Sequence, residues 1–259
     1  CAAVLAGNAV ILKPSEVTPD TGALVGELCR DAGLPEGLVQ VVQGDGTVGA
    51  ALIAERPDKV CFTGSLATGR RVMAACAAHP IPCDLELGGV DALIVLDDAD
   101  LDLASSAAVW GATFNGGQIC ASVERVLVHE AVAEAFVDRV VDKLEQLDPR
   151  RDLGRITLDR QRQVYERHVR DAGARGLTPR VGGGLLDAER FAPTLVEGHG
   201  ITESQVWREE SFGPLLAVAT FRTDDQAVAL HDASDFGLTA SVFGADRARA
   251  TSLAERLHA

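Results

Sequence analysis

The sequence has few aromatic residues, few basic residues and no long apolar run. Aromatic side chains make up 4% of its 259 residues, and 24 Lys and Arg stand against 38 Asp and Glu, for a formal net charge of -14. So acidic a chain repels phosphate backbones and anionic lipid headgroups, which argues against nucleic-acid and membrane partners. Charges such as Lys13 and Asp97 interrupt the apolar stretches well before the roughly 20 residues that span a bilayer. We therefore expect a soluble protein.

The sequence also lacks paired cysteines and the spacings of metal ligands. There is no C-x-x-C motif and no histidine pair at a ligand spacing, so we expect neither a disulfide framework nor a metal site. Free thiols fit a reduced, cytoplasmic setting. The chain starts at Cys1 without the features of a signal peptide, and we expect it to begin inside a larger protein. The six cysteines are Cys1, Cys29, Cys61, Cys76, Cys83 and Cys120.

Short apolar segments alternate with helical patterns in the first hundred residues. Strands are predicted at 9–12, 39–42, 60–62, 84–87 and 92–96, with helices at 48–55 and 66–78. A further helix starts at Pro19, ends before Gly33 and buries an apolar stripe at Leu24, Val25, Leu28 and Cys29. Single helices between strands predict right-handed crossovers and a parallel sheet, whose ligands bind at the carboxyl ends of the strands.

The pattern changes after residue 97 to longer helices. Helices are predicted at 101–114, 131–147 and 158–173, and strands at 125–128, 215–221 and 238–243. The fold class is therefore α/β, with a predicted domain boundary near Gly88 and Gly89 that separates residues 1–88 from residues 89–259.

Two glycine-rich turns each follow a predicted strand. Residues 44–49 (GDGTVG) match G-x-G-x-x-G, but the acid of a dinucleotide fingerprint is missing from the next strand, so a structural turn is the better interpretation. Residues 62–65 (FTGS), with Gly69, open the next helix. Backbone N–H groups there can hold a phosphate, or Ser65 can simply cap the helix, and local sequence favours neither.

One acid and one cysteine stand out by position. Glu86 lies in an apolar strand before Gly88 and Gly89, where a carboxylate is costly unless it faces solvent or has a function. Cys120 follows a polar, glycine-rich loop, whereas Cys29, Cys61 and Cys76 fall in helix or strand patterns. A loop cysteine can be a nucleophile, although an inert thiol is the more common outcome.

Five segments, taken together and in order, resemble the aldehyde dehydrogenase superfamily. They are residues 7–16 (GNAVILKPSE), 62–69 (FTGSLATG), 85–89 (LELGG), 115–120 (NGGQIC) and 209–214 (EESFGP). The resemblance runs along essentially the whole chain. It implies a Rossmann-like cofactor domain in residues 1–88, a catalytic domain in residues 89–259 and oxidation of a small-molecule aldehyde.

The resemblance also implies roles for individual residues. Cys120 looks like the nucleophile that forms a thiohemiacetal and then a thioester, and Glu86 like the general base for its hydrolysis. The carboxylate of Glu16 favours NAD because it would repel a 2'-phosphate, although Lys13 leaves NADP possible. The residues that match the family's cofactor site are Lys13, Pro14, Ser15, Glu16, Gly64, Ser65, Gly69, Leu87, Glu210 and Phe212.

The sequence departs from the family pattern in two respects. Val90 stands where the family usually has lysine. Both ends of the pattern are missing, including the asparagine of the oxyanion hole, so we expect this chain alone to be inactive. The resemblance implies that the full-length protein is a homo-dimer or homo-tetramer. Two alternatives remain open: a CoA-acylating relative, against which Glu86 argues, and a non-catalytic nucleotide-binding module.

Overall fold

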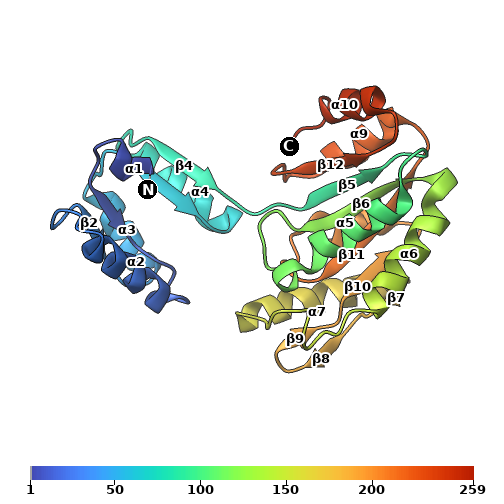
Figure 1. Cartoon of the computed structure of the whole chain (residues 1–259), viewed down its shortest axis with the longest axis horizontal. Coiled ribbons are helices and arrows are strands. Elements are labelled where there is room, and N and C mark those ends of the chain that lie inside the picture. Colours follow the sequence, from blue (N-terminus) through green and yellow to red (C-terminus); the bar gives the residue numbers. More distant parts are fainter. Residues whose placement is uncertain (1) are drawn as a thin grey trace. The chain divides into compact units, whose positions relative to one another are not determined.

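The structure, a computed structural model, describes residues 2–259, and Cys1 lies outside the described residues. The chain divides into two compact units, Cys1–Glu86 and Leu87–Ala259, so the division falls just before Gly88 and Gly89. Blue to cyan marks the first unit in Figure 1, and green to red marks the second. Each unit is described by itself.

The first unit consists of strands and helices in strict alternation after a short helix α1 (Ala2–Leu5). Its strands are β1 (Val10–Leu12), β2 (Val39–Val41), β3 (Val60–Thr63) and β4 (Cys83–Glu86), and its helices are α2 (Pro19–Asp31), α3 (Gly46–Ala54) and α4 (Leu66–Ala77). β1 pairs with β2, and β3 pairs with β4, both in parallel. The predicted parallel pairing is therefore present, in two sheets of two strands each.

Helix α2 buries a different face from the one that the sequence predicts. Its buried residues are Gly22 and Gly26, whereas Leu24 is 51% and Leu28 58% exposed. A Cβ atom at Gly22 would collide with Pro14, so the helix lies against the end of β1 through its glycines. The predicted apolar stripe is therefore largely exposed in this chain, and α2 packs against the strands through its glycines.

The second unit is built on one six-stranded sheet in the order β12-β5-β6-β11-β10-β7. All neighbouring strands are parallel except β7 and β10. The strands are β5 (Asp91–Val95), β6 (Val123–His129), β7 (Pro179–Val181), β10 (Thr194–Glu197), β11 (Leu215–Phe221) and β12 (Ala240–Phe243). A small antiparallel ribbon, β8 (Leu185–Asp187) with β9 (Arg190–Phe191), stands apart from this sheet.

Helices cover both faces of the sheet. They are α5 (Leu101–Thr113), α6 (Ala133–Glu145), α7 (Asp159–Ala174), α8 (Gln205–Arg208), α9 (Asp224–Asp232) and α10 (Arg247–Ala254), with short 3-10 turns η1 (Phe114–Gly117), η2 (Glu130–Val132) and η3 (Ile201–Glu203). Among residues 2–259, no helix is both long and apolar enough to cross a membrane.

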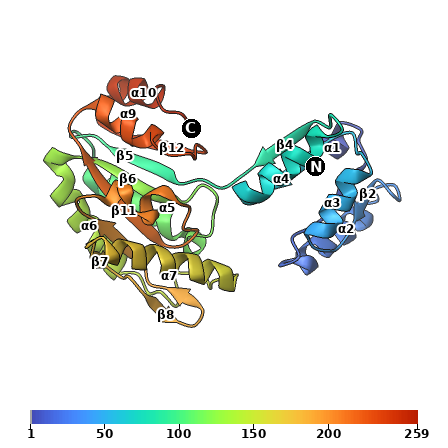
Figure 2. The ribbon, with the colours of Figure 1, turned by 180° about the vertical axis from the view of Figure 1, so that it is seen from behind.

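The second unit has two hydrophobic cores, one on each face of the sheet, and alternate side chains of β5 belong to each. Leu93 and Val95 pack with the apolar faces of α5 and α6, whereas Ala92, Ile94 and Leu96 pack with residues of α7, α8, α9 and α10. Successive side chains of a strand point to opposite faces, so one buried strand serves two hydrophobic cores. Figure 2 shows the ribbon from behind, with α7 and α9 toward the viewer.

Candidate active site

The turn that carries Cys120 is formed by three successive residues in left-handed backbone conformation. Asn115, Gly116 and Gly117 have φ angles of 52°, 67° and 73° in the 3-10 turn η1 that follows α5. Glycine and asparagine adopt this conformation at low cost. The chain therefore reverses sharply, and Cys120 follows in a turn with its thiol exposed.

The amide side chain of Gln118 ties this turn to the segment that precedes α7. Its Nε2 donates to the carbonyl oxygens of Asn115 (3.1 Å) and Arg155 (2.8 Å), and its Oε1 accepts the N–H of Thr157 at 2.9 Å. On the other side of the cysteine, the Ser122 hydroxyl donates to a carbonyl of α5 at 3.1 Å. Cys120 is thus held between two anchored residues.

Two glycines at the start of the second unit contact two of the other predicted segments. A Cβ atom at Gly89 would lie 2.9 Å from the carbonyl oxygen of Cys120, and one at Gly88 would collide with the carboxylate of Glu210. Only glycine fits such close approaches. The second unit therefore brings Cys120 and Glu210 to the same pair of glycines.

The cysteine turn and the segment after Glu210 also meet through glycine. A Cβ atom at Gly117 would collide with the backbone of Gly213 and lie 2.7 Å from the nitrogen of Pro214. The two motifs are about a hundred residues apart in sequence, so no local pattern reveals this contact.

Glu210 has a buried oxygen that lacks a partner. Among the described residues, no donor bonds to its Oε1. Burial raises the pKa of Glu210 to about 7, opposed by the nearby Gly89 amide and supported by the negative charge of Asp91. A buried acceptor without a partner is uncommon in folded proteins, and this oxygen lies against Gly88.

The backbone at Phe212 is strained and held by a carboxylate that the sequence analysis missed. Phe212 has a φ angle of 47°, which is uncommon for a residue other than glycine. The Oε1 of Glu124 accepts the N–H of Phe212 at 2.8 Å, and its Oε2 accepts the N–H of Ser211 at 2.7 Å. Burial raises the pKa of Glu124 to about 8, although both amides oppose the shift.

Arg125, next to Glu124 on β6, was missed as well. Its Nε donates to the carbonyl oxygen of Val90 at 2.8 Å and its NH1 to that of His231 at 3.2 Å, while its guanidinium lies over the ring of Trp207. Two adjacent charges in the apolar sequence VERVLVH were the available signal, because buried charges require partners. Val90 itself is 1% exposed, so an apolar side chain fits where the family usually has lysine.

In the first unit, the turn at Gly64 and Ser65 leaves a helix N-terminus that suits an anion. The Ser65 hydroxyl accepts the N–H of Thr68 at 3.4 Å, so it does cap α4. The N–H groups of Leu66 and Ala67 have no partner within the helix by geometry, and α4 has no acid in its first turn. Gly69 is buried one turn further along α4.

The other glycine-rich turn is already occupied by a carboxylate. The Oδ1 of Asp45 accepts the N–H of Thr47 at 2.9 Å and its hydroxyl at 2.6 Å, which lowers the pKa of Asp45. This negative charge at the N-terminus of α3 repels a phosphate. The geometry agrees with the interpretation of residues 44–49 as a structural turn.

Lys13 closes β1 and binds the backbone around it. Its ammonium donates to the carbonyl oxygens of Pro14 (2.6 Å) and Gly44 (2.7 Å) and lies 3.8 Å from a carboxylate oxygen of Glu16. The Ser15 hydroxyl accepts the N–H of Val17 at 3.3 Å, which shapes the same turn. Glu16 is exposed, so its carboxylate is free to accept further hydrogen bonds.

Glu86 is the last residue of β4 and of the first unit. Burial alternates along this strand, so Glu86 is exposed while Leu85 is partly buried. Its carbonyl oxygen accepts the N–H of Gly64 at 3.0 Å, which joins the end of β4 to the turn before α4. Leu87 begins the second unit. The encounter of Glu86 with Cys120 spans two units and stays a prediction.

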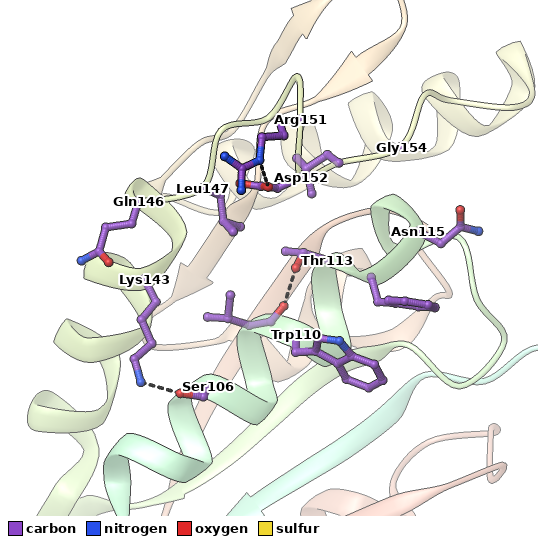
Figure 3. A pocket seen from close by; sticks show the side chains of 13 residues that line it. Ser106, Trp110, Thr113, Asn115, Lys143, Gln146, Leu147, Arg151, Asp152 and Gly154 are labelled. Carbon is purple, nitrogen blue, oxygen red and sulfur yellow. Dashed lines mark hydrogen bonds and ion pairs between the residues drawn. The ribbon is translucent and has the colours of Figure 1, made fainter.

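A hollow of about 770 Å³ lies beside α5 in the second unit. Trp110 and Phe114 line it with rings 5.1 Å apart, and they are 65% and 51% exposed. Figure 3 shows Trp110 on one side of the hollow and residues 151–154 on the other.

Comparisons with known proteins agree with the resemblance and with the α/β fold. A model of the "Aldehyde dehydrogenase family" matches residues 1–259. The chain is 47% identical to a 4,4'-diapolycopene aldehyde oxidase of Methylomonas sp over 98% of its own length and 48% of that relative. The chain thus spans about half the length of the relatives it matches.

The solved structures that this chain resembles are also aldehyde dehydrogenases. An NAD-dependent aldehyde dehydrogenase from Sinorhizobium meliloti superposes with a TM-score of 0.92 at 35% identity, over 97% of this chain and 52% of that one. A betaine aldehyde dehydrogenase from Staphylococcus aureus, in complex with NAD+, does so with a TM-score of 0.90 at 32% identity, over 96% and 52%. The family model matches the whole chain, and the second unit brings the cysteine turn and Glu210 to Gly88 and Gly89. The chain therefore belongs to the aldehyde dehydrogenase family.

Proposed function

We propose that this chain is part of an enzyme that oxidises an aldehyde to a carboxylic acid with NAD, through a covalent intermediate on Cys120. Residues 1–88 supply part of the cofactor domain and residues 89–259 part of the catalytic domain. The observation that carries the proposal is the convergence of the Cys120 turn, Gly88, Gly89 and Glu210 in the second unit.

Several groups of the chain fit the parts of NAD. The carboxylate of Glu210 would accept a hydrogen bond from a hydroxyl of the nicotinamide ribose, and Phe212, two residues later, would contact the same part of NAD. The N-terminus of α4, at Gly64 and Ser65, offers backbone N–H groups to the pyrophosphate. Lys13, with its neighbours Pro14, Ser15 and Glu16, would bind the adenosine ribose.

The charge distribution supports NAD over NADP. The exposed carboxylate of Glu16 accepts hydrogen bonds from ribose hydroxyls and repels a 2'-phosphate. The ammonium of Lys13 donates to two carbonyl oxygens and lies 3.8 Å from a carboxylate oxygen of Glu16, so its N–H groups face the chain's own acceptors. NADP therefore stays the less favoured cofactor.

Cys120 acts first as a nucleophile. Its thiolate sulfur bonds to the aldehyde carbon and the carbonyl oxygen takes a proton or a hydrogen bond, which gives a thiohemiacetal. When bound, NAD would supply the acceptor for the hydride that leaves this carbon; the hydroxyl proton passes to water as the C=O bond re-forms, and a thioester on Cys120 remains. The exposed thiol and its anchored turn suit such an attack.

Glu86 then acts as a general base. Its carboxylate takes a proton from water as the water oxygen bonds to the thioester carbon. The carbon–sulfur bond then breaks, which restores the thiolate of Cys120 and releases the carboxylic acid. A position at the carboxyl end of β4, next to the turn of Gly64, is where ligands of parallel sheets bind. A CoA-acylating enzyme does not need this base.

The hollow beside α5 is the candidate path for the aldehyde. Trp110 and Phe114 form an exposed aromatic wall of this hollow, and Phe114 begins the 3-10 turn that leads to Cys120. Exposed apolar surfaces mark sites of binding in soluble proteins. Polar and charged residues such as Lys143 and Asp152 line the hollow as well, so the wall alone does not define the class of aldehyde.

The complete protein provides the decisive experiment. Replacing Cys120 with alanine should abolish aldehyde oxidation, followed by NADH absorbance, and leave the NAD dissociation constant unchanged in calorimetry. Cys61→Ala removes another exposed thiol and should retain activity. Turnover in the Cys120→Ala variant, or its loss in Cys61→Ala alone, would refute the assignment.

The chain by itself should be inactive, since it spans about half the length of its relatives. An oxyanion donor contributes about a hundredfold or more to rate, and the expected asparagine donor is not in this sequence. We further propose that the complete enzyme works in the cytoplasm as a homo-dimer or homo-tetramer.

A further inference from the structure

The carboxylate of Glu124, which has no part in the proposed chemistry, bonds the backbone of the segment that carries Glu210. Glu124, on β6, is 1% exposed and accepts two successive backbone N–H groups, from Ser211 at 2.7 Å and from Phe212 at 2.8 Å. Both oxygens are used, one for each amide. A buried carboxylate is tolerated only with such partners, so its presence in an apolar strand calls for a function.

The two amides immediately follow Glu210, so they control the direction of its side chain. Phe212 has a left-handed backbone with a φ angle of 47°, which a residue with a Cβ atom keeps only when its surroundings hold it. Rotation of this backbone would swing Glu210 away from Gly88, against which its carboxylate now lies. Glu124 bonds the strained residue itself.

Other contacts hold the segment but do not replace Glu124. From α7, the Gln161 amide donates to the carbonyl oxygen of Ser211, and His168 Nδ1 lies 3.0 Å from the Ser211 hydroxyl. Burial lowers the pKa of His168, so this imidazole acts as a neutral partner. These bonds fix Ser211, whereas the N–H of Phe212 is bonded by Glu124.

We propose that Glu124 is a positioning residue, which orients Glu210 toward the nicotinamide ribose by bonding the two amides that follow it. The inference rests on the proposed function, because it requires NAD to bind at Glu210. Glu124 does not itself contact the cofactor. Its effect on affinity should therefore pass entirely through Glu210.

The test is a double-mutant cycle on NAD affinity in the complete protein, measured by calorimetry at pH 9, where Glu124, with a pKa of about 8, is a carboxylate. Glu124→Gln keeps the shape of the side chain but offers one acceptor oxygen in place of two, so NAD should bind about tenfold more weakly. Glu210→Gln should weaken NAD to a similar degree. The double variant should be no weaker than Glu210→Gln alone, because Glu124 acts through Glu210.

A matched control separates this effect from the loss of any carboxylate that accepts two backbone N–H groups. Asp246 also accepts two backbone N–H groups, those of Ala248 at 2.9 Å and Arg249 at 3.1 Å, at the start of α10. Asp246→Asn should leave NAD affinity unchanged. Amide hydrogen exchange, read by NMR without cofactor, should speed up at Ser211 and Phe212 in Glu124→Gln only.

The outcomes distinguish the two proposals. If the wild-type protein does not bind NAD, the proposed function fails. If it binds NAD but Glu124→Gln binds equally well, or the two substitutions add, the positioning role fails alone. Should Glu124→Gln not fold, slow exchange of the Phe212 amide in the wild type supports the anchor, and fast exchange overturns it.

Discussion

Replacing Gly117 with alanine should destabilise the second unit by the combined cost of two defects. The left-handed backbone, with a φ angle of 73°, costs an alanine about 1–2 kcal/mol. The new methyl group would also collide with the backbone of Gly213, and overpacking of this kind adds about 1–3 kcal/mol. We expect a total loss of about 3 kcal/mol, which corresponds to a fall in Tm of roughly 6–12 °C.

The contribution of the collision is measured against Gly176→Ala. Gly176 has a similar φ angle of 79°, but nothing lies within 4 Å of an added Cβ atom. This variant should lose only the backbone cost, about 1–2 kcal/mol or roughly 2–8 °C in Tm. Trp110 and Trp207 both lie in the second unit, so tryptophan fluorescence during thermal unfolding reports on that unit alone.

The comparison tests the close approach on which the site depends. Equal losses in the two variants would show that Gly117 does not press against Gly213, and the convergence of the cysteine turn with the Glu210 segment would lose its support. A loss at Gly176 larger than that at Gly117 would contradict the reasoning altogether. Circular dichroism at low temperature checks that both variants fold.

Three further results are expected. Burial raises the folded pKa of Glu124 to about 8 and of Glu210 to about 7, so the free energy of unfolding should fall as the pH rises toward 8. In urea denaturation, Glu210→Gln should make this fall with pH shallower. An unchanged dependence of the unfolding free energy on pH would contradict the prediction. Iodoacetamide should alkylate Cys120 much faster than the equally exposed Cys61 if the complete enzyme activates its nucleophile, and mass spectrometry of the labelled peptides decides this. Trp110→Ala should raise the KM for the aldehyde and leave the NAD dissociation constant unchanged, whereas weaker NAD binding would remove Trp110 from the aldehyde path.

Much of the fold follows from local pattern. Strand β11 has the predicted bounds, and α5 and α7 end within one residue of theirs, because periodic apolar residues and helix-ending glycines act over short distances. The helices α1, α8, α9 and α10 and the strands β7, β8, β9 and β10 were not predicted. Most of them have two to four residues, too few for a period to show, but α9 and α10, with nine and eight residues, were missed as well.

The candidate site divides in the same way. Family motifs in the sequence were enough to indicate Cys120, Glu86 and Glu210. Nothing in the local sequence indicates that Glu124 bonds Ser211 and Phe212, since the partners are 87 and 88 residues apart. The charge in an apolar strand was a signal that some partner existed, without saying which.

The sequence by itself therefore determined the α/β class, the family and most of the order of strands and helices up to residue 174, because these depend on neighbouring residues and on motifs that are read along the chain. Only the tertiary structure decided which face of α2 packs, which glycines allow segments to touch and which buried oxygen lacks a donor. Those outcomes depend on the distance between atoms far apart in sequence, and packing sets that distance only once the whole unit has folded.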